Sequence, residues 1–583
     1  MFLAKRYDKK TGRTYLSIKE GFRNDKGIPT SRTIKTIGYL DSVHENFPDI
    51  VGDPLEYFEK MVVKMTQENN DAKCTTIEIK TSDSLNLNTN NKYTYGSIVL
   101  SSIYHELELH EFFTNKAKYR NFDFLPNKVM QLIIYSRILY PGSKLNTFAQ
   151  KNRFFDIEHD KDHLIDLQHI YRTLDFVADL KPDLIKWLNK RISQKYERDT
   201  SIIFYDVTNY YYESDTLSEL RQKGYSKENK KTPIIQMGLA VDNNGIPITY
   251  ELFSGNTPDA KTYDTALLSI KDNYETDKIV IVADRGLNSG DNIAHTTIEG
   301  NGYIFGQSIK SLSKKDQEYV FNNDRYQIYK YDDDDIFKYK SRVVNRKIRV
   351  SSLETKNKRE AELLQKQIVF YSSKYAKRCQ KKREIAIEKA LKIIMNPSLY
   401  DSQSDKGAFS YVLNYEIDDK TGELKAKKNT SLILDTAKIK EESKYDGYYM
   451  IVTSETKMAD SKILDSYHGL WKIEETFKIT KSDLNARPIY LHNEERIRAH
   501  FLMCYLSIVV LRILQWKTAN KYSCSKLIDE IKNIECIYAD KSNYLFSYRS
   551  TITDEFNEIF NLDIGKKWMS KNAINKSFSK LRK

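Results

Sequence analysis

The chain has 583 residues, of which 40% are hydrophobic, so it can form roughly two to four domains with at least one large core. Its 21 glycines and 11 prolines are too few for a collagen-like or largely disordered chain. The formal net charge of +13 favours a polyanionic partner, nucleic acid before an anionic membrane surface.

The apolar segments argue against a membrane or secreted protein. The first residues, MFLAKRYDKK, contain no apolar signal region. The longest apolar run, residues 501–511, is about half of the ~20 residues that span a bilayer, which predicts a buried core helix. The five cysteines are scattered without a Cys-x-x-Cys pair, which excludes a disulfide scaffold or cysteine zinc site and favours a reducing cytoplasm.

The N-terminal region of the chain changes its hydrophobic pattern twice. Residues 2–40 alternate and contain two turn-forming segments, which predicts a β-meander. Residues 66–95 are polar and rich in asparagine, as is typical of a connector, with one short strand at 75–80. Between 96 and 199 the apolar residues recur with a period near 3.6, which predicts several helices.

Strand-length apolar runs begin at residue 201. They occur in the order strand, strand, strand, helix, strand, helix, strand, which predicts a mixed α/β sheet whose first and fourth strands are neighbours. The regular pattern is then lost over residues 311–445. A last strand at 447–454 precedes a long helix at 461–482, and further helices are expected up to the C-terminus.

Three acidic residues stand out in this region. Asp206 and Asp284 each follow a buried apolar strand, where a carboxylate is unfavourable unless a cap, an arginine or a metal ion compensates it. Either can simply begin a turn, but two on adjacent strands also fit a Mg²⁺ site. On the long helix, Tyr467, Glu474 and Lys481 are spaced by seven and form one stripe. Gly469 inside this helix predicts a close approach by another element.

The residues around these positions resemble a known family. YDVTNYYYES, VADRG and YHGLWKIEETFKITKSDLNARPIY are similar to segments of DDE-type insertion-sequence transposases. The resemblance is to the branch with a Tyr-Arg-Glu-Lys signature and a β-rich insertion before the catalytic glutamate. It covers residues 200–515 most strongly. The chain departs from the signature at Leu470, which replaces the arginine and is predicted to pack beside Ile473 and Phe477.

The resemblance implies a site and its chemistry. An RNase H-like core holds two Mg²⁺ or Mn²⁺ ions on the catalytic residues Asp206, Asp284 and Glu474, with Asp206 between the ions. Tyr467 and Lys481 grip phosphates of the transposon end, and Arg285 and Lys478 are further candidates for DNA binding. A very basic helix at 374–392 is either a solvated charged face or a DNA-binding surface. Its candidate residues are Lys374, Lys377, Arg378, Lys381, Lys382 and Arg383.

These observations predict an α/β protein: an RNase H-like mixed-sheet core interrupted by a large insertion, with an N-terminal β-meander, a helical N-terminal domain and a helical C-terminal tail. The expected domains are the meander (1–45), a connector (46–95), a helical DNA-end-recognition domain (96–199), the first segment of the core (200–310), the insertion (311–445), the second segment of the core (446–515) and the tail (516–583).

The expected function is a DNA transposase that binds terminal inverted repeats, cleaves them by metal-dependent hydrolysis and joins the 3′ ends to target DNA. Its expected partner is double-stranded DNA, on which it assembles as a homodimer, in the bacterial cytoplasm near the nucleoid. No phosphate-binding loop for ATP is found, so no nucleotide cofactor is expected. Two alternatives stay open: a metal-dependent nuclease or resolvase without strand transfer, and a non-catalytic DNA-binding derivative.

Overall fold

The computed structural model describes residues 1–23, 28–48, 50, 52–71, 82, 84, 87, 90–158, 164–213, 215–224, 232–273, 278–332, 335–351, 358–396, 406–417, 424–426, 431–540 and 542–582. The chain forms two compact units, Met1–Leu87 and Asn88–Lys583. The short strand expected at 75–80 lies outside the described residues.

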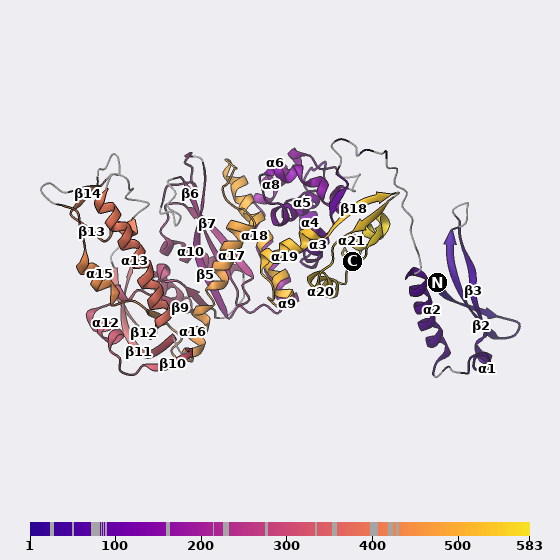
Figure 1. The fold of residues 1–583 in the computed structure, drawn as a ribbon, viewed down its shortest axis with the longest axis horizontal. Coiled ribbons are helices and arrows are strands. Elements are labelled where there is room, and N and C mark those ends of the chain that lie inside the picture. Colours follow the sequence, from indigo (N-terminus) through magenta and orange to yellow (C-terminus); the bar gives the residue numbers. More distant parts are fainter. Residues whose placement is uncertain are drawn as a thin grey trace. The chain divides into compact units, whose positions relative to one another are not determined.

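The N-terminal unit is an antiparallel β-meander covered by a helix (Figure 1). Leu16 and Ile18 of the central strand and Phe58 and Val62 of the helix form its core, so this unit has an apolar core of its own. The predicted meander is confirmed, and a helix occupies a portion of the range expected to be a connector. The elements are β1 (Phe2–Asp8), β2 (Arg13–Arg23), β3 (Pro29–Tyr39), α1 (Val43–Asn46) and α2 (Pro54–Asp71).

The larger unit is built on a mixed sheet whose core strands run in the order β7-β6-β5-β8-β9. Strand β6 is antiparallel to β5 and β7, whereas β8 is parallel to both β5 and β9. The predicted adjacency of the first and fourth strands is confirmed, and this arrangement is RNase H-like. The elements are β5 (Ile202–Tyr211), β6 (Ile234–Val241), β7 (Pro247–Ser254), α10 (Asp259–Asn273), β8 (Val280–Ala283), α11 (Gly290–Ile298) and β9 (Gly302–Gln307).

Alternation along each strand divides the buried side chains between the two faces of this sheet. Phe204 and Val282 belong to one core cluster, together with residues of α17 (Trp471–Lys478) and α18 (Glu494–Lys517). Tyr205 and Ala283 belong to the other, which contains residues of α10 and α11. Figure 1 shows α10 on one side of β5 and β7, and α17 and α18 on the other.

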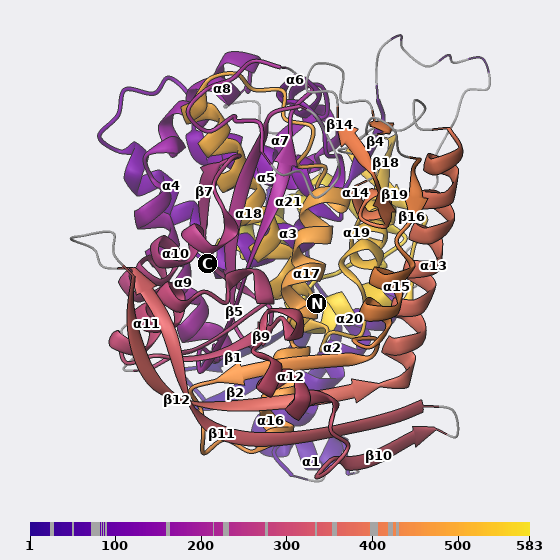
Figure 2. The same ribbon diagram turned by 90° about the vertical axis from the view of Figure 1, so that its left-hand side faces the viewer.

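The insertion extends the core sheet. Strand β12 pairs with β17 (Tyr448–Thr453), which pairs with β9, so the full order is β10-β11-β12-β17-β9-β8-β5-β6-β7. Figure 2 shows the long strands β11 and β12 beside the helix α13. The insertion comprises α12 (Lys314–Phe321), β10 (Gln327–Asp332), β11 (Asp335–Ser351), β12 (Lys358–Ser372), α13 (Ser373–Met395), α14 (Lys406–Phe409), β13 (Val412–Leu413), β14 (Tyr415–Ile417), β15 (Leu424–Ala426), β16 (Ile433–Leu434) and α15 (Thr436–Ser443).

The helices predicted at 96–199 are confirmed and share one apolar core with α18 and one face of the mixed sheet. Among the described residues, α18 is the helix long and apolar enough to cross a membrane, but 94% of its apolar window is buried inside the protein. The buried core helix predicted at 501–511 is therefore confirmed. The helices are α3 (Ser97–Glu106), α4 (Leu109–Ala117), α5 (Pro126–Leu139), α6 (Lys144–Ala149), α7 (Phe155–Glu158), α8 (Leu167–Ala178) and α9 (Lys181–Tyr196).

The C-terminal tail contains helices and also strands. Strands β18 to β20 form a small antiparallel sheet with β4 (Lys92–Thr94) from the other end of this unit. Tyr544 and Phe546, at alternate positions of β19, are buried, and so is Cys536 of β18, but these strands are too short for a clear period-two pattern in the sequence. The elements are α19 (Cys524–Asn533), β18 (Glu535–Asp540), β19 (Asn543–Phe546), α20 (Thr551–Phe560), β20 (Trp568–Ser570) and α21 (Lys571–Lys580).

Candidate active site

The two aspartates lie side by side on the face of the sheet that carries α17. The parallel register pairs Tyr205 with Ala283, so Asp206 and Asp284 are the next residues on the two strands. Each follows by two positions a side chain of the α17-facing core, Phe204 or Val282, and therefore points to the same face. Asp284 directly follows β8, as predicted. Asp206 does not end its strand, because β5 continues to Tyr211 along its antiparallel partner β6.

Glu474 comes from the helical segment above this face, which is not one continuous helix as predicted. The segment consists of α16 (Asp460–His468), α17 and a π-helical turn at Ile479–Asp483. The break falls at Gly469, where an added Cβ would lie 2.4 Å from the Phe204 ring. The close approach predicted from this glycine is confirmed. It lets the helix pack directly on β5, and Glu474 then lines the same cavity as the two aspartates.

The three acidic residues lie around one cavity of about 600 Å³. Asp206, Asp284 and Glu474 line it, and both Asp284 and Glu474 are exposed to solvent. Leu470 lines the same cavity while packing against the core. The remaining wall is largely aromatic and includes residues of the insertion. Its residues are Phe337, Phe370, Ser372, Tyr375, Tyr449, Tyr467, His468, Trp471 and Ile473.

Two tyrosines hold Asp284 in place. The hydroxyls of Tyr449 and Tyr467 lie 3.2 and 3.3 Å from Asp284 Oδ1 and 2.6 Å from each other. Burial, with the charge of Asp284, raises the pKa of Tyr449 to about 12, and burial likewise raises the pKa of Tyr467, so both hydroxyls keep their protons at neutral pH. Gly306 makes room for the pair, because a Cβ there would lie 2.6 Å from the Tyr467 hydroxyl.

The donors around Asp284 leave one of its oxygens accessible. The backbone N–H of Arg285 donates to Oδ1 at 2.7 Å, and the two tyrosine hydroxyls lie at 3.2 and 3.3 Å from the same atom, so the hydrogen bonds made to Asp284 within the described residues all reach one oxygen. Oδ2 remains available to a ligand in the cavity. In the described portion of the chain, no group of three Asp, Glu, His or Cys side chains is already gathered closely enough to hold a metal ion.

The other predicted residues are distributed around this cavity. Lys481 lies in the π-helical turn, where Leu484 N–H donates to Ile479 C=O at 2.9 Å, so the regular α-helical spacing expected from Glu474 to Lys481 is interrupted. Its Nζ lies 5.8 Å from the centre of the Tyr210 ring, and it does not line the cavity. Lys478 is exposed on α17, and Arg285 is exposed beside Asp284.

The basic residues of the insertion lie on α13. Lys374, Lys377, Arg378, Lys381 and Lys382 are exposed, and their spacing of three and four places them along one side of the helix. Arg383 is different, because it forms a two-point ion pair with Asp446 at 2.7 and 2.5 Å. A second cavity of about 630 Å³ links this helix to the carboxylates, since it is lined by Arg285 and Lys382 and shares Tyr375 and Tyr449 with the first.

The family of the chain follows from comparison with known proteins. A family model described as the transposase DDE domain matches residues 197–510, more than half of the chain. The chain belongs to this family of DDE transposases. A second model, the IS1634 family transposase N-terminal domain, matches residues 3–75 of the N-terminal unit. Together the two matches make the chain an insertion-sequence DDE transposase. No curated protein matches it.

Two solved transposase structures are similar to the chain at low scores. A cryo-EM structure of the piggyBac transposase synaptic complex with hairpin DNA is 7% identical over 84% of this chain and 85% of that chain, with a TM-score of 0.34. The Mos1 transposase paired-end complex with left transposon end is 12% identical over 45% of this chain and 70% of that chain, with a TM-score of 0.14. Neither likeness adds to the family assignment.

Several residues of the transposase site were missed from the sequence. Phe337, Phe370 and Tyr375 come from the insertion, and Tyr449 comes from β17. Gly306, inside the apolar run GYIFGQ, was an available signal, because a glycine within a buried strand indicates a close approach by another group. The partner, the hydroxyl pair of Tyr449 and Tyr467, could only be found in the folded chain.

Replacing Tyr449 tests the tyrosine pair of the transposase. Tyr449→Phe removes one of the two donors to Asp284 while the ring keeps its stacking on Phe370, at 5.3 Å between centroids. A hydrogen bond to a charged group contributes about 1.5–3 kcal/mol, so DNA cleavage is expected to slow by roughly tenfold or more. The melting temperature should change little. Tyr448→Phe, on the opposite face of the same strand, is the matched control, and an equal effect in both variants would contradict this role for Tyr449.

Proposed function

We propose that this transposase binds the terminal inverted repeats of an insertion sequence, cleaves them and joins the 3′ ends to target DNA. The observation that carries the proposal is the convergence of Asp206, Asp284 and Glu474 on one open cavity. The three residues come from β5, the end of β8 and α17, and two of them are solvent-exposed, so a DNA strand can reach them.

The donor set of this cavity fits hard divalent cations. Asp206, Asp284 and Glu474 offer only carboxylate oxygens, the ligands that Mg²⁺ and Mn²⁺ prefer, and Asp284 presents Oδ2 toward the cavity. We propose that Asp206, Asp284 and Glu474 would hold two such ions. When bound, the ions would supply activation of the attacking oxygen and stabilisation of the leaving 3′ oxygen. Tyr449 and Tyr467 orient Asp284, because both hydroxyls keep their protons at neutral pH.

The DNA path of this proposal runs from the carboxylates toward the insertion. Arg285 lies next to Asp284, and Lys382 lines the adjoining cavity, so cations continue outward from the site. The exposed lysines and arginine on one side of α13 continue this row of cations. Arg383 contributes less in this proposal, because its charge is paired with Asp446. Lys478 and Lys481 are proposed to contact phosphates outside the cavity.

Charge removal on α13 tests this path. Each phosphate contact changes the slope of log K against log salt by about 0.9, because counterions are released when the contact forms. The Lys381→Gln/Lys382→Gln double variant is therefore expected to bind duplex DNA more weakly and with a slope smaller by roughly 2. Lys576→Gln/Lys580→Gln, at two exposed lysines of α21, removes the same charge outside this path and should change neither quantity. Equal slopes in the wild type and the double variant would remove α13 from the DNA path.

A strand-transfer assay tests the function itself. The substrate is a labelled duplex carrying the inverted repeat that flanks the reading frame, mixed with a supercoiled target plasmid. With Mg²⁺ the proposal predicts labelled plasmid, and a chelator should abolish the product. Cleavage without joining would instead support a nuclease or resolvase, and binding without cleavage would support a non-catalytic derivative.

We further propose how the transposase is organised on its DNA. The helical region at 96–199, helped by the N-terminal unit, reads the terminal repeat, since the catalytic core acts at a phosphate and has no need to read bases. The protein is proposed to act as a homodimer on paired ends, in the bacterial cytoplasm near the nucleoid.

A further inference from the structure

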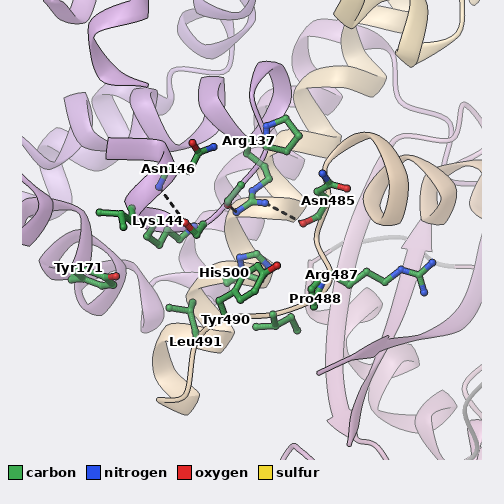
Figure 3. Close-up of a pocket in the computed structure, with 15 residues that line it drawn as sticks. Arg137, Lys144, Asn146, Tyr171, Asn485, Arg487, Pro488, Tyr490, Leu491 and His500 are labelled. Carbon is green, nitrogen blue, oxygen red and sulfur yellow. Dashed lines mark hydrogen bonds between the residues drawn. The ribbon is translucent and has the colours of Figure 1, made fainter. Parts of the chain in front are cut away.

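A cavity of about 680 Å³ lies outside the carboxylate site, within the same compact unit. It is formed by the end of α5, the start of α6, a stretch of α18 and the segment 485–491 that follows the π-helical turn. Figure 3 shows Arg137, Lys144 and His500 gathered around this cavity from three different helices. Arg487 also lines it, but in Figure 3 it points away from these three groups.

Lys144 is the decisive group in this cavity. It is 5% exposed, and its Nζ has no hydrogen-bond partner among the described residues. Burial and the neighbouring Arg137 lower the pKa of Lys144 to about 7, so a large share of the molecules carry the charge at neutral pH. A buried ammonium without a partner is strongly unfavourable, and proteins normally pair such groups.

The groups around Lys144 do not neutralise it. Arg137 is 4% exposed and donates to the carbonyl oxygens of Leu484, Asn485 and Gly142 at 3.1, 3.3 and 3.1 Å, while its Nε has no partner within the described residues. Burial lowers the pKa of His500 well below its usual value, and Arg137 and Lys144 lower it further. The residues that line the cavity, all of them in the described portion of the chain, include no Asp or Glu.

Two buried cations and a histidine around one cavity, without an acid, are arranged to receive an anion. A phosphate oxygen accepts charge-assisted hydrogen bonds from both lysine and arginine and supplies the missing negative charge. The cavity is larger than one phosphate, and Tyr171, Tyr490 and Leu491 add an apolar rim on which a sugar or base can lie. A ligand with a phosphate for the cations and a sugar or base for the apolar rim is a nucleotide.

We propose that this cavity is a phosphate-binding site, and that in the working protein the phosphate belongs to a DNA strand. The assignment to DNA rests on the proposed function. It is supported by position, because the lining residue Asn485 follows Glu474 on the same segment, two residues beyond the end of the π-helical turn at Ile479–Asp483. A strand held here is anchored away from the carboxylates and contributes affinity without taking part in the chemistry.

The first experiment uses the wild-type protein without divalent metal. Inorganic phosphate is expected to raise its melting temperature well above the value in chloride at equal ionic strength, because the anion binds the folded state. Lys144→Met keeps the length of the side chain without its charge. It is expected to be at least as stable as the wild type in chloride and to bind phosphate about tenfold or more weakly. Lys576→Met, at an exposed lysine of α21, is the control and should respond like the wild type.

Two results would overturn the site. One is a wild type that phosphate stabilises no more than chloride does, and the other is a Lys144→Met protein that responds to phosphate as the wild type does. If Lys144→Met does not fold, Lys144→Gln and the wild-type measurement decide the matter in the same way.

The source of the phosphate is tested with a short duplex, again without metal. If the site binds DNA, Lys144→Met should weaken duplex binding and reduce its salt slope, whereas Lys576→Met should not. Unchanged duplex binding with lost phosphate binding would overturn the DNA assignment and leave a site for free phosphate or a nucleotide. Failure of strand transfer in the wild type would overturn the proposed function and leave the Lys144-dependent phosphate response intact.

Discussion

Asp206→Asn, Asp284→Asn and Glu474→Gln are each expected to abolish metal-dependent DNA cleavage while leaving end binding nearly unchanged. Each change removes one carboxylate from the cavity and preserves the size of the side chain. The variants should therefore lose negative charge and metal affinity while their packing is unchanged. The basic surface that attracts DNA is untouched. Cleavage and gel-shift affinity measured on the same preparations test both halves of this expectation.

The neighbouring Glu475 provides a matched control for Glu474. Its carboxylate points to Arg512, at 2.8 Å, and does not line the cavity. Glu475→Gln should therefore keep cleavage well above that of Glu474→Gln, with its main effect on stability. Wild-type cleavage by any of the three cavity variants would remove that residue from the proposed site.

Arg512→Met is expected to be the most destabilising single change considered for this chain. Arg512 of α18 is 5% exposed and anchors α17 through three hydrogen bonds. Its guanidinium donates to Glu475 Oε2 at 2.8 Å, to Thr476 Oγ1 at 2.6 Å and to the Lys472 carbonyl oxygen at 2.8 Å. Breaking a buried pair of this kind costs about 3–5 kcal/mol, because the partner charge stays behind without compensation. Since α17 carries Glu474, cleavage should fall together with the melting temperature.

Arg496 on the same helix is the control for this prediction. It also forms a two-point ion pair, with Asp175 at 2.6 and 2.8 Å, but both side chains are substantially exposed. Exposed pairs contribute at most about 1 kcal/mol, so Arg496→Met should shift the unfolding transition only slightly. Equal shifts for Arg512→Met and Arg496→Met would show that Arg512 does not support α17.

The aspartates of the site could be predicted because local patterns fix them. Asp206 and Asp284 each sit two residues beyond a buried strand residue, and the order of strands and helices makes β5 and β8 neighbours. Their common face then follows from the period of a strand. The same reasoning failed for the end of β5, since the pairing of its second half with β6 depends on a partner about thirty residues away.

The helical segment was predicted less well. A glycine inside a helix indicates that something lies close, yet nothing local identifies Phe204 as the neighbour. The π-helical turn at Ile479–Asp483 has no local signature either, so the even spacing of seven from Glu474 to Lys481 suggested a stripe that the backbone does not keep. The position of Leu470 was also only partly predictable. It packs against the core as expected, but the same side chain lines the cavity as well.

The insertion was the hardest region to predict, because its role depends on long-range pairing. Its strands join the catalytic sheet through β17, and this brings Phe337 and Phe370 to the carboxylates. The irregular pattern of residues 311–445 shows nothing of this connection. Lys144 was missed for the opposite reason, since a single lysine in a helical region reads as exposed until its burial is seen.

The position of the insertion in the sheet also affects how the chain is made. While the protein is being synthesised, β9 has no partner on its outer side until β17 emerges, and Gln307 and Tyr448 are separated by the whole insertion. At about 5–20 residues per second, this edge stays open for roughly 7 to 28 seconds, during which it can pair with other chains. Glu474 is made later still. A nascent chain that already folds β5 and β8 therefore lacks its third carboxylate, and ribosome-bound or prematurely terminated chains are expected to be unable to cut DNA.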